Sequence, residues 1–110
     1  MTESRALEEE CPDDAPAPAA DAVVRVMRIV NEKGLHARAS AKFVQTVEKF
    51  EADVRVLRCG ESVGGTSIMG LMSLAAARGT DITVDAVGKD AEAVVAAIDS
   101  LVSSRFGEDE

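Results

Sequence analysis

Apolar residues recur along the chain with two different spacings, and the order of these spacings predicts seven elements. Four runs have the β-branched or alternating character of strands: residues 23–30, 53–59, 62–65 and 80–87. Three runs have the 3.6-residue spacing of amphipathic helices: residues 37–50, 67–77 and 91–104. Gly79 is expected to end the second helix, and Asp90 to cap the third. The predicted order is β-α-β-β-α-β-α.

This order predicts an α/β (α+β) fold. Each strand can bury one face under helices and leave the other exposed to water. The natural packing is an open-faced sandwich, a four-stranded antiparallel sheet with three helices on one face. A chain of 110 residues has room for one such domain. No run approaches the ~20 uncharged apolar residues of a membrane span, and the N-terminus lacks the pattern of a secretory signal. We therefore expect a cytoplasmic protein that is not inserted in a membrane.

The net charge of -8 lies at the two ends of the chain. Residues 1–21 carry seven acidic side chains against Arg5 and all three prolines, which predicts a disordered acidic tail. Residues 107–110 add three acidic side chains, an acidic C-terminal tail, whereas residues 22–106 hold ten acidic and eleven basic ones and form the predicted domain. The negative balance, without Trp or Tyr, argues against a nucleic-acid partner.

Two cysteines and one histidine give the chain few candidate ligands for a metal ion. Cys11 and Cys59 are too few for a disulfide framework and lack a second ligand pair for zinc, so both are expected to be free thiols. His36 has no second histidine or acidic partner in its own segment. The sequence thus predicts neither a metal site nor a cofactor.

His36 lies where a loop meets the first predicted helix. The first N–H groups of a helix lack internal partners and carry partial positive charge, so anions bind there. A phosphoryl group on His36 would lie against the amides of Ala37 and Arg38, and the Arg38 guanidinium could bind its oxygens. Neutral imidazole is a nucleophile at physiological pH. Position alone favours a capping or surface histidine over a catalytic one, and Ser40 is more simply a first-turn residue than a nucleophile.

The second predicted helix is too apolar for one buried face. Its large apolar residues span roughly 220° of the helical wheel, whereas packing one face needs about 100°. Leu71 and Leu74 are the better core candidates. The remaining residues would form an exposed protein-binding patch, unless a loop covers them: Ile68, Met69 and Met72.

Ser67 occupies the N-cap position of this helix, and capping alone would explain a serine there. A phosphate on Ser67 would nonetheless be tolerated by the fold, while placing about -2 charge beside the apolar patch. Such a modification would change partner binding more than folding.

These two segments resemble those of a known family. The run Gly34-Leu35-His36-Ala37-Arg38 resembles the active-site signature of HPr, the histidine-containing phosphocarrier of the bacterial phosphoenolpyruvate-dependent phosphotransferase system. The run Ser67-Ile68-Met69-Gly70-Leu71-Met72-Ser73-Leu74 resembles its regulatory-serine helix, and the similarity extends over residues 23–106. The resemblance implies the sheet order 1-4-2-3. It also implies that His36 accepts a phosphoryl group on Nδ1 from phosphorylated enzyme I and passes it to a histidine of an IIA domain, with Arg38 binding the phosphoryl oxygens.

Further roles follow from the resemblance only. Ser67 would be the target of HPr kinase/phosphorylase, and the exposed patch, with Arg38 and Lys42, would dock onto the partners. The chain would be a monomeric carrier of phosphoryl groups, without stand-alone enzyme activity.

The sequence also departs from the family. Ala39 stands where the family usually has proline, and Thr66 replaces the lysine common before the regulatory serine. The residues leave open whether the carrier serves a sugar or a nitrogen-regulatory branch, and which IIA protein accepts the phosphoryl group. A second function class is a non-catalytic α/β regulatory module that binds a partner or small ligand through the methionine patch.

Overall fold

The elements follow the order that the apolar spacing predicts. The computed structural model describes residues 21–108. Its helices and strands are β1 (Val23–Arg28), α2 (Ala37–Val47), β2 (Asp53–Arg58), β3 (Glu61–Gly64), α3 (Ile68–Ser73), β4 (Asp81–Val87) and α4 (Ala91–Ser103), followed by the 3₁₀ turn η1 (Arg105–Gly107).

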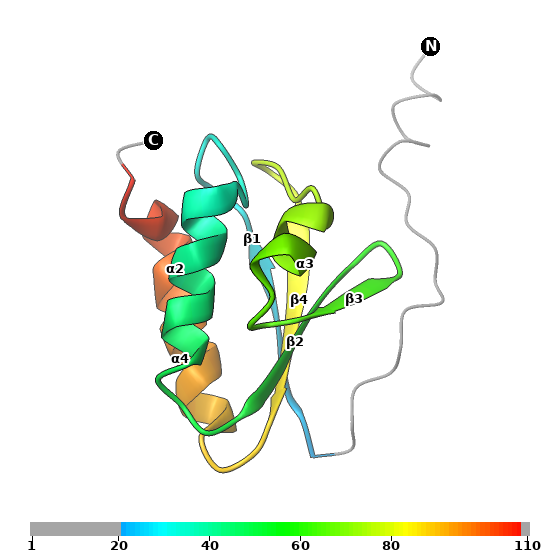
Figure 1. Ribbon diagram of the computed structural model, residues 1–110, viewed down its shortest axis with the longest axis vertical. Helices are drawn as coiled ribbons and strands as arrows, with labels where there is room; N and C mark the ends of the chain where they lie inside the picture. Colours follow the sequence, from blue (N-terminus) through cyan, green and yellow to red (C-terminus); the bar gives the residue numbers. More distant parts are fainter. Residues whose placement is uncertain (1–20, 109–110) are drawn as a thin grey trace.

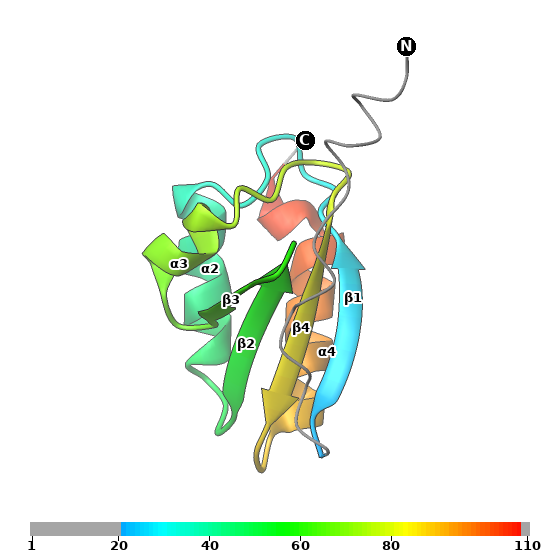
Figure 2. The ribbon, with the colours of Figure 1, turned by 90° about the vertical axis from the view of Figure 1, so that its right-hand side faces the viewer.

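The four strands form one antiparallel sheet in the order β1-β4-β2-β3, which confirms the predicted fold class. The helices cover one face of this sheet, and the other face is open (Figures 1 and 2). The alternation in β4 explains the two faces: Ile82, Val84 and Ala86 are fully buried against the helices, whereas Thr83 and Asp85 lie on the other face. On that face Asp85 is itself buried, in an ion pair with Arg55 of β2.

Between the sheet and the helices lies a core of aliphatic side chains and two phenylalanines. The helix α4 contributes one of its faces to this core: Val94, Val95, Ile98 and Val102. The charged Arg25 interrupts the apolar run of β1 because its side chain reaches α4. There, its Nη1 atom lies 3.0 Å from Oδ2 of Asp99.

The helix α3 is shorter than the sequence predicts. It ends at Ser73, instead of residue 76 or 77, because Ala75 adopts a left-handed conformation (φ 53°) that an α-helix cannot continue. Nη1 of Arg58 donates to the carbonyl oxygen of Leu74 at 3.1 Å, which satisfies an acceptor at this helix end. The expectation that Gly79 ends the helix is therefore wrong.

Asp90 precedes α4 as predicted, but its side chain does not cap the helix. Its carboxylate instead accepts a hydrogen bond from the amide of Glu51 at 2.8 Å, and so it holds the loop between α2 and β2. The predicted boundary is right and the predicted contact is wrong.

The expectation of a free thiol is wrong at Cys59, which is disulfide-bonded. Cys11 lies outside the described residues, as do residues 1–20 of the predicted acidic tail and residues 109–110. Within residues 21–108 no helix is both long and apolar enough to cross a membrane.

Candidate functional site

The loop before α2 is held in place by the loop that follows α3. The amide of Leu35 donates to the carbonyl oxygen of Ala76 at 3.0 Å. Gly34 has a φ of 66°, and a Cβ atom there would lie 2.4 Å from the same oxygen. Only glycine therefore permits this approach of the two loops. The contact fixes the backbone immediately before His36.

His36 is the N-cap residue of α2. Its backbone is extended (φ -79°, ψ -175°), and its carbonyl oxygen accepts from the amide of Ser40 at 2.9 Å. The amide of Arg38 donates to Nδ1 of the imidazole at 3.3 Å. The histidine is thus a capping residue, and its Nδ1 atom faces the free amides of the first helical turn.

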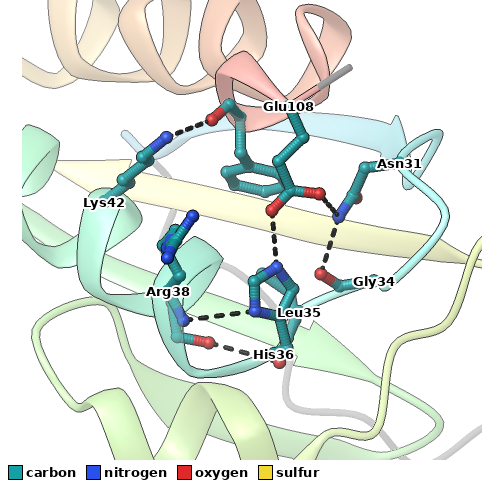
Figure 3. A network of polar contacts seen from close by, with 9 residues as sticks. Asn31, Gly34, Leu35, His36, Arg38, Lys42 and Glu108 are labelled. Atoms are coloured by element: carbon teal, nitrogen blue, oxygen red, sulfur yellow. Dashed lines mark hydrogen bonds and ion pairs between the residues drawn. The ribbon is translucent and has the colours of Figure 1, made fainter. Parts of the chain in front are cut away.

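The other ring nitrogen contacts a residue from the far end of the chain. Nε2 of His36 lies 2.5 Å from Oε2 of Glu108, and 28% of the histidine side chain is exposed. Nδ2 of Asn31, which is fully buried, donates to Oε1 of Glu108 at 3.1 Å and to the carbonyl oxygen of Gly34 at 2.9 Å. Figure 3 shows this chain of contacts from Gly34 through Asn31 and Glu108 to the imidazole.

These contacts assign the tautomer of His36. The amide of Arg38 can only donate, so Nδ1 must accept and carries no proton. An ionised Glu108 can only accept, so Nε2 must carry the proton. The ring is therefore the neutral Nε2–H form, with the lone pair of Nδ1 directed at the start of α2.

Glu108 is held ionised by its neighbours. Burial by itself would raise the pKa of its carboxyl group, but the hydrogen bonds from His36 and Asn31 outweigh burial, and the net result is a lowered pKa. The positive charge of Lys33 acts in the same direction.

An open cleft lies beside the imidazole, between the start of α2 and the C-terminal segment. Three cationic side chains line it, from Lys33, Arg38 and Lys42, together with the carboxylates of Glu32 and Glu108. The side chain of Arg38 is exposed, and its guanidinium has no partner among residues 21–108. The cleft therefore offers an anion free cationic and amide donors beside Nδ1.

Lys42 has a role that the sequence does not predict. Its Nζ atom donates to the carbonyl oxygen of Phe106 at 2.6 Å (Figure 3). Phe106 itself is fully buried, so this bond and the core together fix the C-terminal segment against α2. Lys42 also lines the cleft, and an ammonium group has three donors, so one bond to Phe106 leaves donors for an anion there.

No group of three or more His, Cys, Asp or Glu side chains within the described part of the chain could hold a metal ion. The chemistry available at this site is that of a nucleophilic imidazole beside an anion-binding helix start.

Comparison with known proteins decides the family. Residues 23–104 match the protein-family model described as "PTS HPr component phosphorylation site". The chain belongs to the HPr family. A phosphocarrier protein HPr of Neisseria meningitidis is 46% identical over 84 residues, which cover 76% of this chain and 94% of that protein. The HPr of Pseudomonas aeruginosa is 43% identical over 83 residues, which cover 74% and 92%.

Solved HPr structures share the fold. An HPr structure from Thermoanaerobacter tengcongensis has a TM-score of 0.77 and 39% identity, and covers 80% of this chain and 99% of its own. The phosphocarrier HPr of Bacillus anthracis has a TM-score of 0.72 and 38% identity, with 74% and 98% covered. This chain is therefore a phosphocarrier of the phosphotransferase system, as its resemblance to HPr implies.

The apolar patch of this HPr family member is exposed. Leu71 and Leu74 are buried in the core as predicted. No loop of the described residues covers the other three, whose exposed fractions are 39%, 82% and 43%: Ile68, Met69 and Met72.

Ser67 caps α3, as predicted. Its Oγ atom accepts from the amide of Gly70 at 2.9 Å, and the residue is exposed.

Sequence reasoning missed two residues of the site, Asn31 and Glu108. The apolar spacing places Asn31 in no predicted element, and Glu108 falls only in the acidic C-terminal tail. One signal in the sequence could have predicted the contact of Glu108 with His36. Phe106 is an isolated aromatic residue after the last helix, and its burial requires the C-terminal segment to fold back onto the domain.

Proposed function

We propose that His36 carries the phosphoryl group of this HPr family member, bound to Nδ1. The observation that carries the proposal is the position of Nδ1 at the start of α2, where the amide of Arg38 lies 3.3 Å away. The donor is phosphorylated enzyme I, and the acceptor is a histidine of an IIA protein. We place this transfer in the cytoplasm.

The surroundings of Nδ1 support a bound phosphoryl group. Amides of Ala37 and Arg38 at the helix start would hold its oxygens, because these donors have no partner inside the helix. The Arg38 guanidinium, which has no partner among the described residues, would add a charge-assisted hydrogen bond. The helix dipole would favour the added negative charge.

Docking is proposed to use the surface beside this site. The patch of Ile68, Met69 and Met72 is apolar and exposed, and Arg38 and Lys42 provide cationic donors on α2, the helix that packs against α3. A surface with an apolar centre and cationic edge fits partners that present apolar and acidic groups. The protein acts as a monomer in this proposal.

The test is phosphoryl transfer from phosphoenolpyruvate through enzyme I. The intact protein should gain an acid-labile phosphoryl group, and His36→Ala should gain none, because His36 is the sole histidine in the chain. Mass spectrometry at neutral pH measures both. An adduct of equal yield in His36→Ala would refute the assignment. Partner binding that is unchanged in His36→Ala, without any adduct in the parent, would favour the alternative of a non-catalytic binding module. A panel of sugar-type and nitrogen-type IIA proteins would then assign the branch.

Ser67 is proposed as a regulatory site for HPr kinase/phosphorylase. Its hydroxyl is exposed at the edge of the apolar patch, so an added phosphate would place charge on the docking surface without entering the core. Thr66 stands in place of the usual lysine, so recognition of Ser67 by this kinase needs its own phosphorylation assay.

Ser67→Asp should slow phosphorylation of His36 by enzyme I and leave the thermal midpoint nearly unchanged. The carboxylate of aspartate can still accept from the Gly70 amide, so the helix cap is retained. Transfer rates and thermal unfolding measure the two effects. Transfer at the parent rate would contradict the inhibitory role.

A further inference from the structure

Glu108 is a residue that neither the family signature nor the predicted domain contains, yet it touches the proposed phosphoryl carrier. Its Oε2 atom lies 2.5 Å from Nε2 of His36, and 17% of its side chain is exposed. A carboxylate buried to this extent beside a ring nitrogen acts on the proton of that nitrogen more strongly than a solvated one.

The carboxylate is held on its second oxygen as well. Oε1 accepts from Nδ2 of Asn31 at 3.1 Å. The orientation of the Asn31 amide is itself fixed, because both of its partners, Glu108 and the carbonyl of Gly34, are acceptors. The Oδ1 atom of Asn31 is consequently left without a partner among the described residues.

The backbone conformation of the three residues before Glu108 places its side chain beside His36. These residues, Arg105, Phe106 and Gly107, have φ values of 60°, 55° and 77°. This left-handed run reverses the chain after α4, and the buried Phe106 ring anchors it. The Lys42 ammonium holds the Phe106 carbonyl at 2.6 Å.

We propose that Glu108 is a positioning residue for phosphoryl transfer: by accepting the Nε2–H of His36, it keeps the proton on Nε2 and leaves Nδ1 as the nucleophile. The inference rests on the proposed function, in which Nδ1 receives the phosphoryl group.

The proton then stays in place through the transfer. In capture, the lone pair of Nδ1 forms the N–P bond, and the bond between phosphorus and the donor breaks with its electron pair on the donor. The imidazole becomes cationic, and the Glu108 carboxylate balances its charge through Nε2–H. In release, the N–P electron pair returns to Nδ1 as the acceptor nitrogen binds phosphorus. The ring leaves as neutral imidazole, and no proton is exchanged with water.

Glu108→Gln tests this role directly, because the hydrogen bond from Asn31 fixes the orientation of the glutamine amide. Asn31 Nδ2 is a donor, so it would bind the amide oxygen of Glu108→Gln. The NH₂ group would then face Nε2 of His36. That contact is favourable only if Nε2 accepts, which moves the ring proton to Nδ1.

We therefore expect the conservative substitution Glu108→Gln to slow phosphoryl transfer more than Glu108→Ala does. Glu108→Gln should shift the ring toward the Nδ1–H tautomer and slow transfer from enzyme I by roughly 10-fold or more. Glu108→Ala, although it removes more of the side chain, should slow transfer less, because it leaves Nε2–H free and imposes no wrong tautomer. A residue that only tethers the C-terminus would give the opposite order.

The experiment measures the ¹⁵N chemical shifts of both ring nitrogens of the full-length protein, at a pH where the ring is neutral, and the rate of phosphorylation by enzyme I. Glu92→Gln is the matched control, since it removes an equal charge from the first turn of α4, at the opposite end of that helix from the site. This control should keep parent nitrogen shifts and a parent rate.

Parent-like nitrogen shifts in Glu108→Gln would overturn the proposal, whatever the transfer rate. So would a Glu108→Gln rate equal to the parent rate, or a larger loss in Glu108→Ala than in Glu108→Gln. The nitrogen shifts of the unphosphorylated protein remain informative if His36 proves not to carry the phosphoryl group. Failure of the proposed function and failure of this inference are thus distinguishable.

Discussion

At His36, one lone pair serves two purposes. In the unphosphorylated protein, Nδ1 accepts from the Arg38 amide at 3.3 Å, which is long for an N–H···N hydrogen bond and indicates a weak contact. When Nδ1 forms a bond to phosphorus, that amide can turn to a phosphoryl oxygen, a stronger acceptor. Capping and chemistry therefore do not compete at this residue, and the cap holds the nucleophile ready.

The lowered pKa of Glu108 predicts a pH dependence of stability. A carboxyl group whose pKa is lower in the folded than in the unfolded chain stabilises the fold above its unfolded value, about 4.3, and this contribution is lost as the pH falls through the lowered value. The difference in free energy of unfolding between the parent and Glu108→Ala should therefore be largest near neutral pH and shrink in acid.

Urea unfolding of both proteins over a range of pH measures this difference. Comparison of the pair removes the contribution of the other carboxylates, which both proteins share. A difference that stays constant down to about pH 3 would show that Glu108 gains nothing from its partners in the folded state.

At the scale of elements, the end of α3 shapes both functional surfaces. Its early termination at Ser73 keeps Met69 and Met72 on one exposed turn, and it frees Ala76 to accept from Leu35 in the loop before His36. A helix extended to residue 77, as the apolar spacing predicts, would hold Ala76 in a helical conformation and direct its carbonyl along the helix axis, away from this contact.

Ala75→Gly should stabilise the protein by about 1 kcal/mol, because Ala75 has a φ of 53° and a left-handed conformation is strained for alanine but not for glycine. Ala77→Gly is the control, since Ala77 is also exposed and has no positive φ. It should be neutral or destabilising. Urea denaturation with an unchanged m-value measures both, and a loss of stability in Ala75→Gly would contradict this account of the helix end.

At the scale of the whole molecule, the local spacing of apolar residues predicts most of the fold. It does not predict the turn after α4 that brings the C-terminal segment back to His36. The alternation in β4 and the helical spacing in α2 are local properties, so the sheet and its covered face could be predicted. His36 was found because a single histidine before a helix is also a local signal.

The contacts that the sequence does not predict join distant residues. The pair His36 and Glu108 is separated by 72 positions, and it depends on three successive left-handed residues and a buried Phe106. Neither propensity nor periodicity encodes such a reversal. The end of α3 depends in the same way on Arg58 of β2, which donates to the carbonyl oxygen of Leu74 from another element.

The central claim is that Nδ1 of His36 receives the phosphoryl group. It is tested most directly by the scalar coupling between ³¹P and the ring ¹⁵N atoms, in protein labelled with ¹⁵N-histidine and phosphorylated by enzyme I. Because His36 is the sole histidine, the coupled nitrogen needs no assignment to a residue. We predict direct coupling to Nδ1, with the proton on Nε2. Direct coupling to Nε2, or no coupling to either nitrogen in the phosphorylated protein, would contradict the account.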